Sequence, residues 1–106
     1  ADEIRLLVPP LWYFEVGNIL ARRYPAEAPK LLRHLRSLGL EESISQDRYE
    51  TRAHRLATTY RVTFYDASYH ALAETEAGLF VTADEKYLAK AGNAGHILQL
   101  AEWPIG

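Results

Sequence analysis

Residues 79–100 of the chain, LFVTADEKYLAKAGNAGHILQL, alternate between strand and helix patterns. The continuous apolar run at 79–82 is typical of a buried strand. Residues 84–91 predict a short helix that ends at Gly92, and residues 96–100 predict another strand. Strands that alternate with helices favour parallel crossovers, so the sequence predicts an α/β fold.

The rest of the chain continues this alternation. Pro25 separates the first two predicted helices, because proline disfavours helical geometry in the residue before it. Gly39 is the expected end of the second helix, and Thr63 is the expected cap of a later helix that Gly78 ends. The expected elements are a strand at 4–8, a helix at 10–24, a helix after Pro25 that ends near 38, an edge strand or loop at 40–45, helices at 47–60 and 64–77, and an irregular tail at 102–106.

Three of the predicted helices carry apolar side chains at helical spacing, which indicates the faces that form the core. Small residues in the helix after Thr63 predict a close approach to a neighbouring element. The expected core residues are Trp12, Val16, Ile19 and Leu20; Leu31, Leu32, Leu35 and Leu38; and Phe64, Ala67, Ala71 and Leu72.

The composition is that of a soluble globular protein. The chain has 106 residues, of which 48% are hydrophobic and 25% charged, which fits one domain with its own core. No apolar run reaches the roughly 18–20 residues that a membrane span needs. The absence of Cys excludes disulfides and Cys-zinc sites and agrees with a cytoplasmic protein. Met is absent too, so we expect a fragment or a processed chain.

The charges are distributed unevenly along the chain. Residues 22–36 hold five basic residues and one acidic residue, whereas residues 62–85 hold five acidic residues and no Lys or Arg. A bipolar chain of this kind can hold an anionic polymer at one end and a cation at the other. The alternative is that these are ordinary solvated helix faces.

Three carboxylates occupy positions that suit a metal site. Glu15 lies among aromatic and apolar residues, Asp66 lies in the first turn of a helix, and Asp84 follows a predicted strand together with Thr82. Ligands bind at the carboxyl ends of parallel strands in open α/β sheets. Carboxylates with few Lys or His nearby are the ligands that Mg²⁺ or Mn²⁺ prefers, and such a cation can activate water for attack on a phosphodiester.

Each carboxylate also has a structural interpretation. Glu15 can be a surface residue paired with Arg22, Asp66 can complement the helix dipole, and Asp84 is a good N-cap. The four histidines show no metal-ligand spacing with one another. His70 lies four residues after Asp66, so a local pair between them can form.

The three carboxylate segments, in this order, resemble the PIN-domain family and look most like VapC-type toxins of toxin–antitoxin pairs. The resemblance covers about residues 4–101. The segments that carry it are Val8-Pro9-Pro10-Leu11-Trp12 with Glu15-Val16-Gly17-Asn18-Ile19-Leu20, Tyr65-Asp66-Ala67 with Ala71-Leu72-Ala73, and Val81-Thr82-Ala83-Asp84.

The resemblance implies a single PIN-like domain over residues 1–106, built as a three-layer α/β/α sandwich with a parallel sheet. It also implies an Mg²⁺- or Mn²⁺-dependent, single-strand-specific endoribonuclease in the cytoplasm, with a cognate antitoxin and a homodimeric state. Carried over to this chain, the metal ligands and catalytic residues would be Glu15, Asp66 and Asp84, with Thr82 supporting the site by hydrogen bonding and Asn18 lying behind the ligands.

The basic residues suggest where RNA would bind. Arg22 and Arg23, with Arg48, Arg52 and Arg55, can hold RNA phosphates or face an acidic partner, an assignment that rests on charge alone.

One part of the family pattern has no counterpart here. In the family, a first strand that ends in an Asp, followed by a helix, precedes the Glu15 segment, and this unit would take about 25 residues. Asp2 is no substitute, because it precedes the first strand predicted here. We therefore expect that the N-terminal βα unit is missing from this chain and belongs to a longer protein, or that another chain supplies the strand.

Two other functions stay open. One is a non-catalytic PIN-like protein-binding module that lost its activity with the first acidic residue. The other is an unrelated doubly wound domain of receiver type with a Mg²⁺ pocket, although the acidic pair that such domains carry after the first strand is absent. Stabilisation by Mn²⁺ would separate the nuclease and the receiver-type domain from the binding module, and cleavage of RNA would separate the nuclease from the receiver-type domain.

Overall fold

The computed structural model describes residues 6–9, 12–42 and 46–102, and for Gln46 and Asp47 only the backbone. The chain divides into two units, residues 1–44 and 45–106. Asp2, the beginning of the strand expected at 4–8 and most of the expected tail lie outside the described residues.

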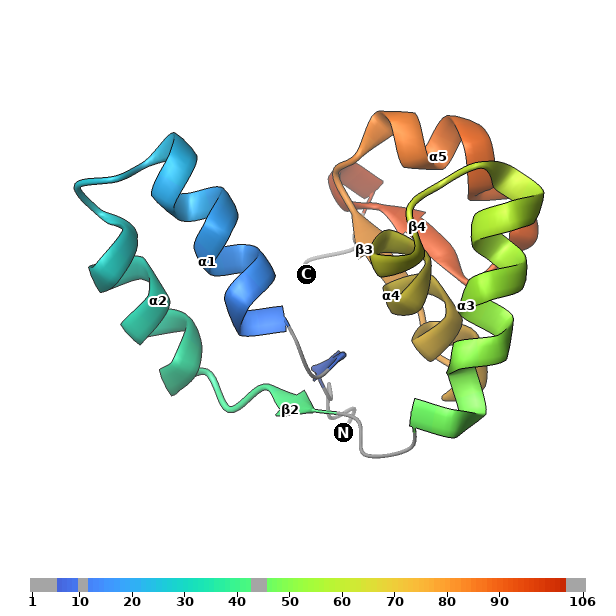
Figure 1. The fold of residues 1–106 in the computed structure, drawn as a ribbon, viewed down its shortest axis with the longest axis horizontal. Coiled ribbons are helices and arrows are strands. Elements are labelled where there is room, and N and C mark those ends of the chain that lie inside the picture. The colour runs from blue at the N-terminus through green and yellow to red at the C-terminus, as the bar shows by residue number, and fades with distance from the viewer. Residues whose placement is uncertain (1–5, 10–11, 43–45, 103–106) are drawn as a thin grey trace. The chain divides into compact units, whose positions relative to one another are not determined.

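The first unit consists of two helices and two very short strands. Its elements are β1 (Leu7–Val8), α1 (Trp12–Arg23), α2 (Ala28–Ser37) and β2 (Glu41–Glu42) (Figure 1). β1 and β2 pair in parallel, with Leu7 opposite Glu41 and Val8 opposite Glu42. The helices confirm the predicted break at Pro25, and the segment at 40–45 contains a strand because β1 supplies hydrogen-bonding partners.

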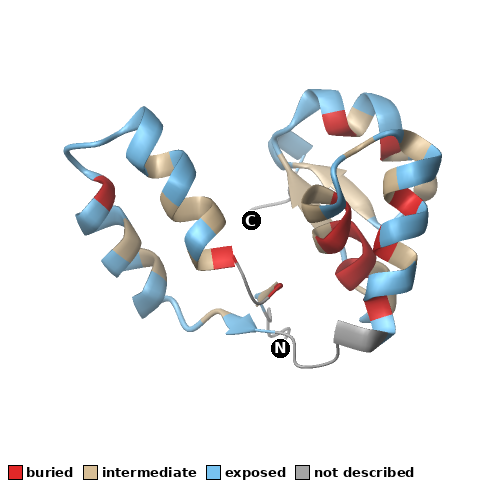
Figure 2. Cartoon of the chain, viewed as in Figure 1, coloured by how far each residue is buried: buried red, intermediate tan, exposed pale blue. Residues whose placement is uncertain are grey.

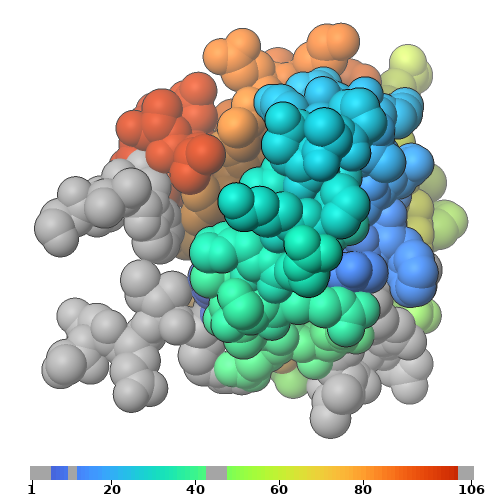
Figure 3. Space-filling view, turned by 90° about the vertical axis from the view of Figure 1, so that its left-hand side faces the viewer, coloured from blue at the N-terminus to red at the C-terminus, as the bar shows by residue number. Residues whose placement is uncertain are grey.

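α1 and α2 pack closely against each other. A Cβ added at Gly17 on α1 would lie 3.6 Å from Leu32 on α2. The guanidinium of Arg36 on α2 lies 4.0 Å from the ring centre of Tyr13 on α1. In Figure 3, the atoms of α2, cyan to green, lie beside those of α1, in blue. α2 is followed by Gly39 with φ +71°, the left-handed conformation expected of a glycine at a helix end.

The apolar faces of α1 and α2 are only partly covered. Trp12 is buried and Leu32 and Leu35 are half-buried, whereas Ile19 and Leu38 are exposed. Leu31 is exposed as well, so fewer of the expected core residues are buried in this unit than the sequence predicted. The physical reason is that, within this unit, α1 and α2 pack against each other, and such a contact between two helices buries a narrow stripe of each surface.

The second unit holds three helices and a parallel strand pair. Its elements are α3 (Gln46–Tyr60), α4 (Phe64–Thr75), β3 (Phe80–Thr82), α5 (Glu85–Ala91), the 3₁₀ turn η1 (Gly92–Ala94), β4 (Ile97–Gln99) and the 3₁₀ turn η2 (Leu100–Glu102) (Figure 1). β3 pairs in parallel with β4, in the register Phe80 to Ile97, Val81 to Leu98 and Thr82 to Gln99. The expected strand–helix–strand crossover at 79–100 is confirmed, with α5 as the crossover helix.

The core of this unit lies between α3 and α4, where the buried residues gather (Figure 2). On α3 they follow helical spacing as Tyr49, Ala53 and Leu56. On α4, Ala67, Ala71 and Leu72 are buried as expected, and the two alanines permit the close approach that their size predicted. Phe64 was also expected in this core, but it is 49% exposed, because it lies in the first turn of α4 at the end of the helix pair.

α4 ends differently from the prediction. The residue with left-handed backbone is Ala77 (φ +55°), and Gly78 follows it. The N–H of Gly78 donates to Ala73 O at 2.7 Å and the N–H of Ala77 donates to Glu74 O at 3.3 Å, a Schellman motif. β3 also differs: it is half-buried and Leu79 before it is 56% exposed, because a two-stranded sheet covers its strands incompletely.

The described residues therefore form a mixed α/β, mostly helical structure with two small parallel sheets, which confirms the α/β class. A three-layer sandwich over a single domain stays a prediction. Among the helices described, none combines the length and the apolar character needed to cross a membrane.

Candidate functional site

Asp66 is placed by the cap of α4. The hydroxyl oxygen of Thr63 accepts a hydrogen bond from Asp66 N–H at 3.1 Å, which confirms Thr63 as the N-cap. Asp66 therefore lies in the first helical turn, where the helix dipole favours a negative charge. Its side chain is half-buried, and its carboxylate accepts no hydrogen bond from the described part of the chain.

Asp84 is placed by the end of β3 and the beginning of α5. The hydroxyl oxygen of Thr82 accepts from Asp84 N–H at 3.0 Å, and Asp84 Oδ1 accepts from Tyr87 N–H at 3.0 Å. Asp84 is thus the N-cap of α5, the structural role that its position suggested. The capping bond uses Oδ1, and the residue is exposed, so Oδ2 remains accessible to a ligand.

Tyr87 connects the surroundings of these two acids. Its backbone N–H donates to Asp84 Oδ1, and its hydroxyl lies 2.7 Å from Nδ1 of His70, one helical turn after Asp66 on α4. Burial is the largest cause that raises the pKa of Tyr87, and the negative charge of Asp66 is the next. Hydrogen bonds of Tyr87 therefore connect α4, through His70, with the N-cap residue Asp84 that follows β3.

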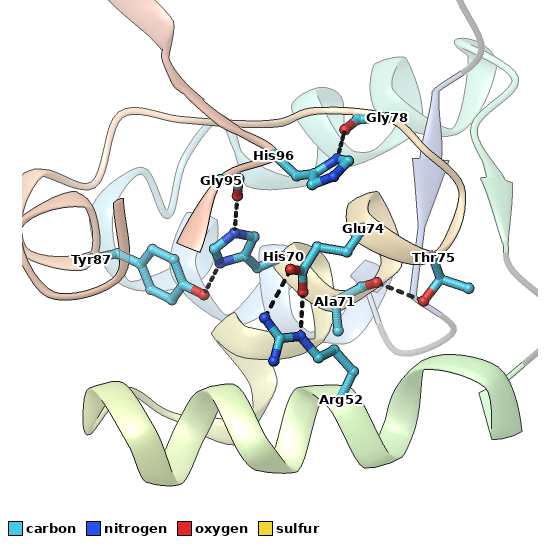
Figure 4. A network of polar contacts seen from close by, with 9 residues as sticks. All are labelled: Arg52, His70, Ala71, Glu74, Thr75, Gly78, Tyr87, Gly95 and His96. Carbon is cyan, nitrogen blue, oxygen red and sulfur yellow. Dashed lines mark hydrogen bonds and ion pairs between the residues drawn. The ribbon is translucent and has the colours of Figure 1, made fainter. Parts of the chain in front are cut away.

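His70 on α4 is fully buried and bonded at both ring nitrogens (Figure 4). Its Nδ1 lies 2.7 Å from the hydroxyl oxygen of Tyr87, and its Nε2 lies 2.7 Å from Gly95 O. The hydrogen-bonded pair of His70 and Asp66 that the spacing allowed therefore does not form, because both ring nitrogens of His70 bind other groups. The signal in the sequence was the position of His70 beside Ala67 and Ala71, which predicts burial, and a buried imidazole needs a partner for each nitrogen.

Arg52 on α3 is bound to Glu74 on α4. Its Nε and one terminal nitrogen donate to the two carboxylate oxygens at 2.8 and 2.9 Å (Figure 4). These hydrogen bonds raise the pKa of Arg52 above its ordinary value. The guanidinium of Arg52 therefore forms a bidentate ion pair within the protein, for which an RNA phosphate would have to compete, and its role in RNA binding stays a prediction.

Four of the remaining predicted site residues lie on α1, in the first unit, whereas Arg48 and Arg55 are exposed on α3. Glu15 is half-buried, Asn18 is exposed, and Arg22 and Arg23 are exposed in the last turn. Over the described residues Glu15 makes no ion pair, so its suggested pairing with Arg22 does not form. The grouping of Glu15 with the two aspartates joins residues of different units and stays a prediction.

The donor chemistry of the aspartates fits a hard divalent cation. Asp66 and Asp84 offer carboxylate oxygens, and Mg²⁺ often binds through one or two carboxylates with water and substrate phosphates as further ligands. Within the described part of either unit taken separately, no three His, Asp or Glu side chains are arranged to hold a metal ion. The two aspartates of the second unit would therefore be an incomplete set of protein ligands.

Comparisons with family models, with curated proteins and with solved structures found no match to this chain. The PIN-domain family therefore stays a prediction from the three carboxylate segments, as do the activity and the partners that it implies.

Proposed function

We propose that the chain is an Mg²⁺- or Mn²⁺-dependent, single-strand-specific endoribonuclease of PIN type, the toxin of a toxin–antitoxin pair. The observation that supports this function is the pair of hydrogen bonds from Tyr87 to Asp84 and to His70, which joins Asp84 to the helix that carries Asp66. Neither aspartate has a basic partner in the described part of the chain. Carboxylates gathered without a cationic side chain repel one another, and a divalent cation relieves that repulsion.

In this proposal each site residue has a defined task. Glu15, Asp66 and Asp84 hold the cation, and Thr82 orients the turn that carries Asp84 through its hydrogen bond to the Asp84 N–H. Asn18 supports the ligands from α1. When bound, the cation supplies an activated water and stabilises charge on the phosphodiester.

The proposal also assigns the partners and the fold. Arg22 and Arg23 at the end of α1 bind phosphates of the RNA substrate. A cognate antitoxin covers the acidic site, the protein forms a homodimer, and it works in the cytoplasm. Residues 1–106 belong to one PIN-like domain, a three-layer α/β/α sandwich with a parallel sheet.

The direct test is cleavage of a fluorescently labelled single-stranded RNA. The wild-type chain should cleave it with Mn²⁺ and not after chelation with EDTA. Asp66→Asn and Asp84→Asn should each abolish that cleavage and leave the circular dichroism spectrum unchanged. Glu85→Gln is the matched control, because Glu85 is an exposed acid in the first turn of α5 that has no task in the site. Full activity in either aspartate variant would show that the site assignment is wrong.

A non-catalytic protein-binding module is the second candidate function. The observation that favours it is the hydrogen bond from Tyr87 N–H to Asp84, which gives this acid a structural task without any metal. Asp66 likewise lies where a helix dipole favours an anion. If this candidate is correct, Mn²⁺ will not raise the melting temperature and no RNA will be cleaved.

A further inference from the structure

The side chain and the backbone of Tyr87 make hydrogen bonds to two different elements. Its N–H donates to Asp84 Oδ1 at 3.0 Å, and its hydroxyl lies 2.7 Å from His70 Nδ1. His70 is one helical turn after Asp66 on α4, and its Nε2 lies 2.7 Å from Gly95 O, just before β4. A continuous series of polar contacts therefore runs from Asp84 through Tyr87 and His70 to Gly95 (Figure 4 shows all but the first contact).

The protons in this series have definite places. A backbone carbonyl can only accept, so Nε2 of His70 must carry the hydrogen that Gly95 O accepts. In a neutral imidazole Nδ1 is then the acceptor, and the hydroxyl of Tyr87 donates to it. His70 is 0% and Tyr87 3% exposed, so water cannot replace a partner that is removed.

Packing around this series joins the elements that carry the two aspartates. The rings of His70 and Tyr87 are 5.5 Å apart, and Phe80 of β3 lies 5.9 Å from the former and 5.5 Å from the latter. Apolar ring contacts allow small rotations, whereas a short hydrogen bond between buried groups is directional. The seven-residue helix α5 is too short to be stable by itself, so its position depends on such contacts.

We propose that His70 and Tyr87 are positioning residues that hold Asp66 and Asp84 at the separation needed to share one divalent cation. This inference rests on the proposed function, since it assumes that the two aspartates bind the cation. Neither residue touches the cation in this arrangement. His70 fixes α5 relative to the first turn of α4, and Tyr87 transmits that position to the carboxylate of Asp84 through its backbone N–H.

Four substitutions in the full chain test this inference. Tyr87→Phe keeps the ring and the backbone N–H but removes the hydroxyl. His70→Gln keeps a donor for Gly95 O but loses the acceptor for Tyr87, whereas His70→Asn keeps that acceptor and loses the donor. Tyr69→Phe is the control, because the hydroxyl of this neighbouring tyrosine contacts Tyr65 and lies outside the series.

The measurement is the affinity for Mn²⁺ alone, from electron paramagnetic resonance of the free ion, at a temperature where circular dichroism shows each variant folded. Tyr87→Phe and His70→Gln should each weaken Mn²⁺ binding about tenfold, the lower end of the effect found when residues that orient metal ligands are removed. His70→Asn and Tyr69→Phe should bind within about twofold of the wild type, since both keep the bond between residues 70 and 87.

The outcomes separate this inference from the proposed function. If the wild type binds no Mn²⁺, the proposed function fails and the inference fails with it. If the wild type binds Mn²⁺ and Tyr87→Phe binds it equally well, only the positioning role is overturned. An equal loss of affinity in both His70 variants would also overturn it, because the shape of the imidazole and not its bond to Tyr87 would then be responsible.

Discussion

Replacing Asp84 separates its two tasks, which are the capping of α5 and the proposed binding of a cation. Asp84→Asn keeps an oxygen that can accept the Tyr87 N–H but removes the negative charge, whereas Asp84→Ala removes both. Asn and Asp are about equally good N-caps, and loss of such a cap costs about 1 kcal/mol. Without metal, we therefore expect Asp84→Ala to lower the free energy of unfolding by about 1 kcal/mol and Asp84→Asn by only a few tenths.

These free energies correspond to measurable shifts in melting temperature. In a domain of this size about 1 kcal/mol moves the melting temperature by roughly 4–8 °C. A cation at ten times its dissociation constant adds about 1.4 kcal/mol to the folded state. Mn²⁺ should therefore raise the melting temperature of the wild type by roughly 6–11 °C and leave that of Asp84→Asn nearly unchanged.

The assay is thermal unfolding followed by circular dichroism, with and without Mn²⁺, on the wild type, both Asp84 variants and the control Glu85→Gln. If Asp84→Asn is as unstable as Asp84→Ala without metal, the argument from helix capping is refuted. If Asp84→Asn is stabilised by Mn²⁺ as strongly as the wild type, Asp84 is not a ligand. The control should behave as the wild type in both conditions.

Replacing Arg22 and Arg23 with Ala should weaken binding of single-stranded RNA and flatten its salt dependence in fluorescence titrations, because fewer counterions are released; an unchanged salt slope would exclude both from the RNA-binding surface. Ala77→Gly should raise the free energy of unfolding in urea by about 1 kcal/mol, since a left-handed backbone costs an L-residue roughly 1–2 kcal/mol; a loss of stability would contradict this. Burial raises the pKa of Tyr49 and Tyr87 above the ordinary value of 10.0, so the folded state keeps protons that the unfolded state releases, and stability should fall as the pH rises above 10.0. Tyr49→Phe should lessen that fall in urea unfolding between about pH 9 and 11, and an equal fall in variant and wild type would be evidence against the shift.

The neighbouring residues in the sequence predicted the local structural roles of Asp84 and Asp66. The position of Asp84 before a helix predicted its capping role, and that role is observed. The position of Asp66 after Thr63 likewise predicted its place in a first helical turn. The assignment of both acids, with Glu15, to a cation rests on the resemblance to PIN domains and on carboxylate chemistry, and it stays a prediction.

The sequence by itself determined the features that depend on residues close together in the chain. These features arise from side chains within about four residues of the backbone groups that they affect. They are the helical spacing of apolar residues, the break at Pro25, the caps at Thr63 and Asp84, and the left-handed Gly39. The same local signals predicted the parallel crossover at 79–100, because a strand, a short helix and a strand in that order favour one connection.

Only the tertiary structure decided which distant groups meet. The strand at 41–42 exists because it pairs with β1, more than thirty residues earlier in the chain. Arg52 bonds a carboxylate 22 residues away, and His70 bonds partners 17 and 25 residues away. These partners lie on separate elements and meet only when the core closes, because burial removes the water that would otherwise satisfy each polar group and so requires a partner from another part of the fold.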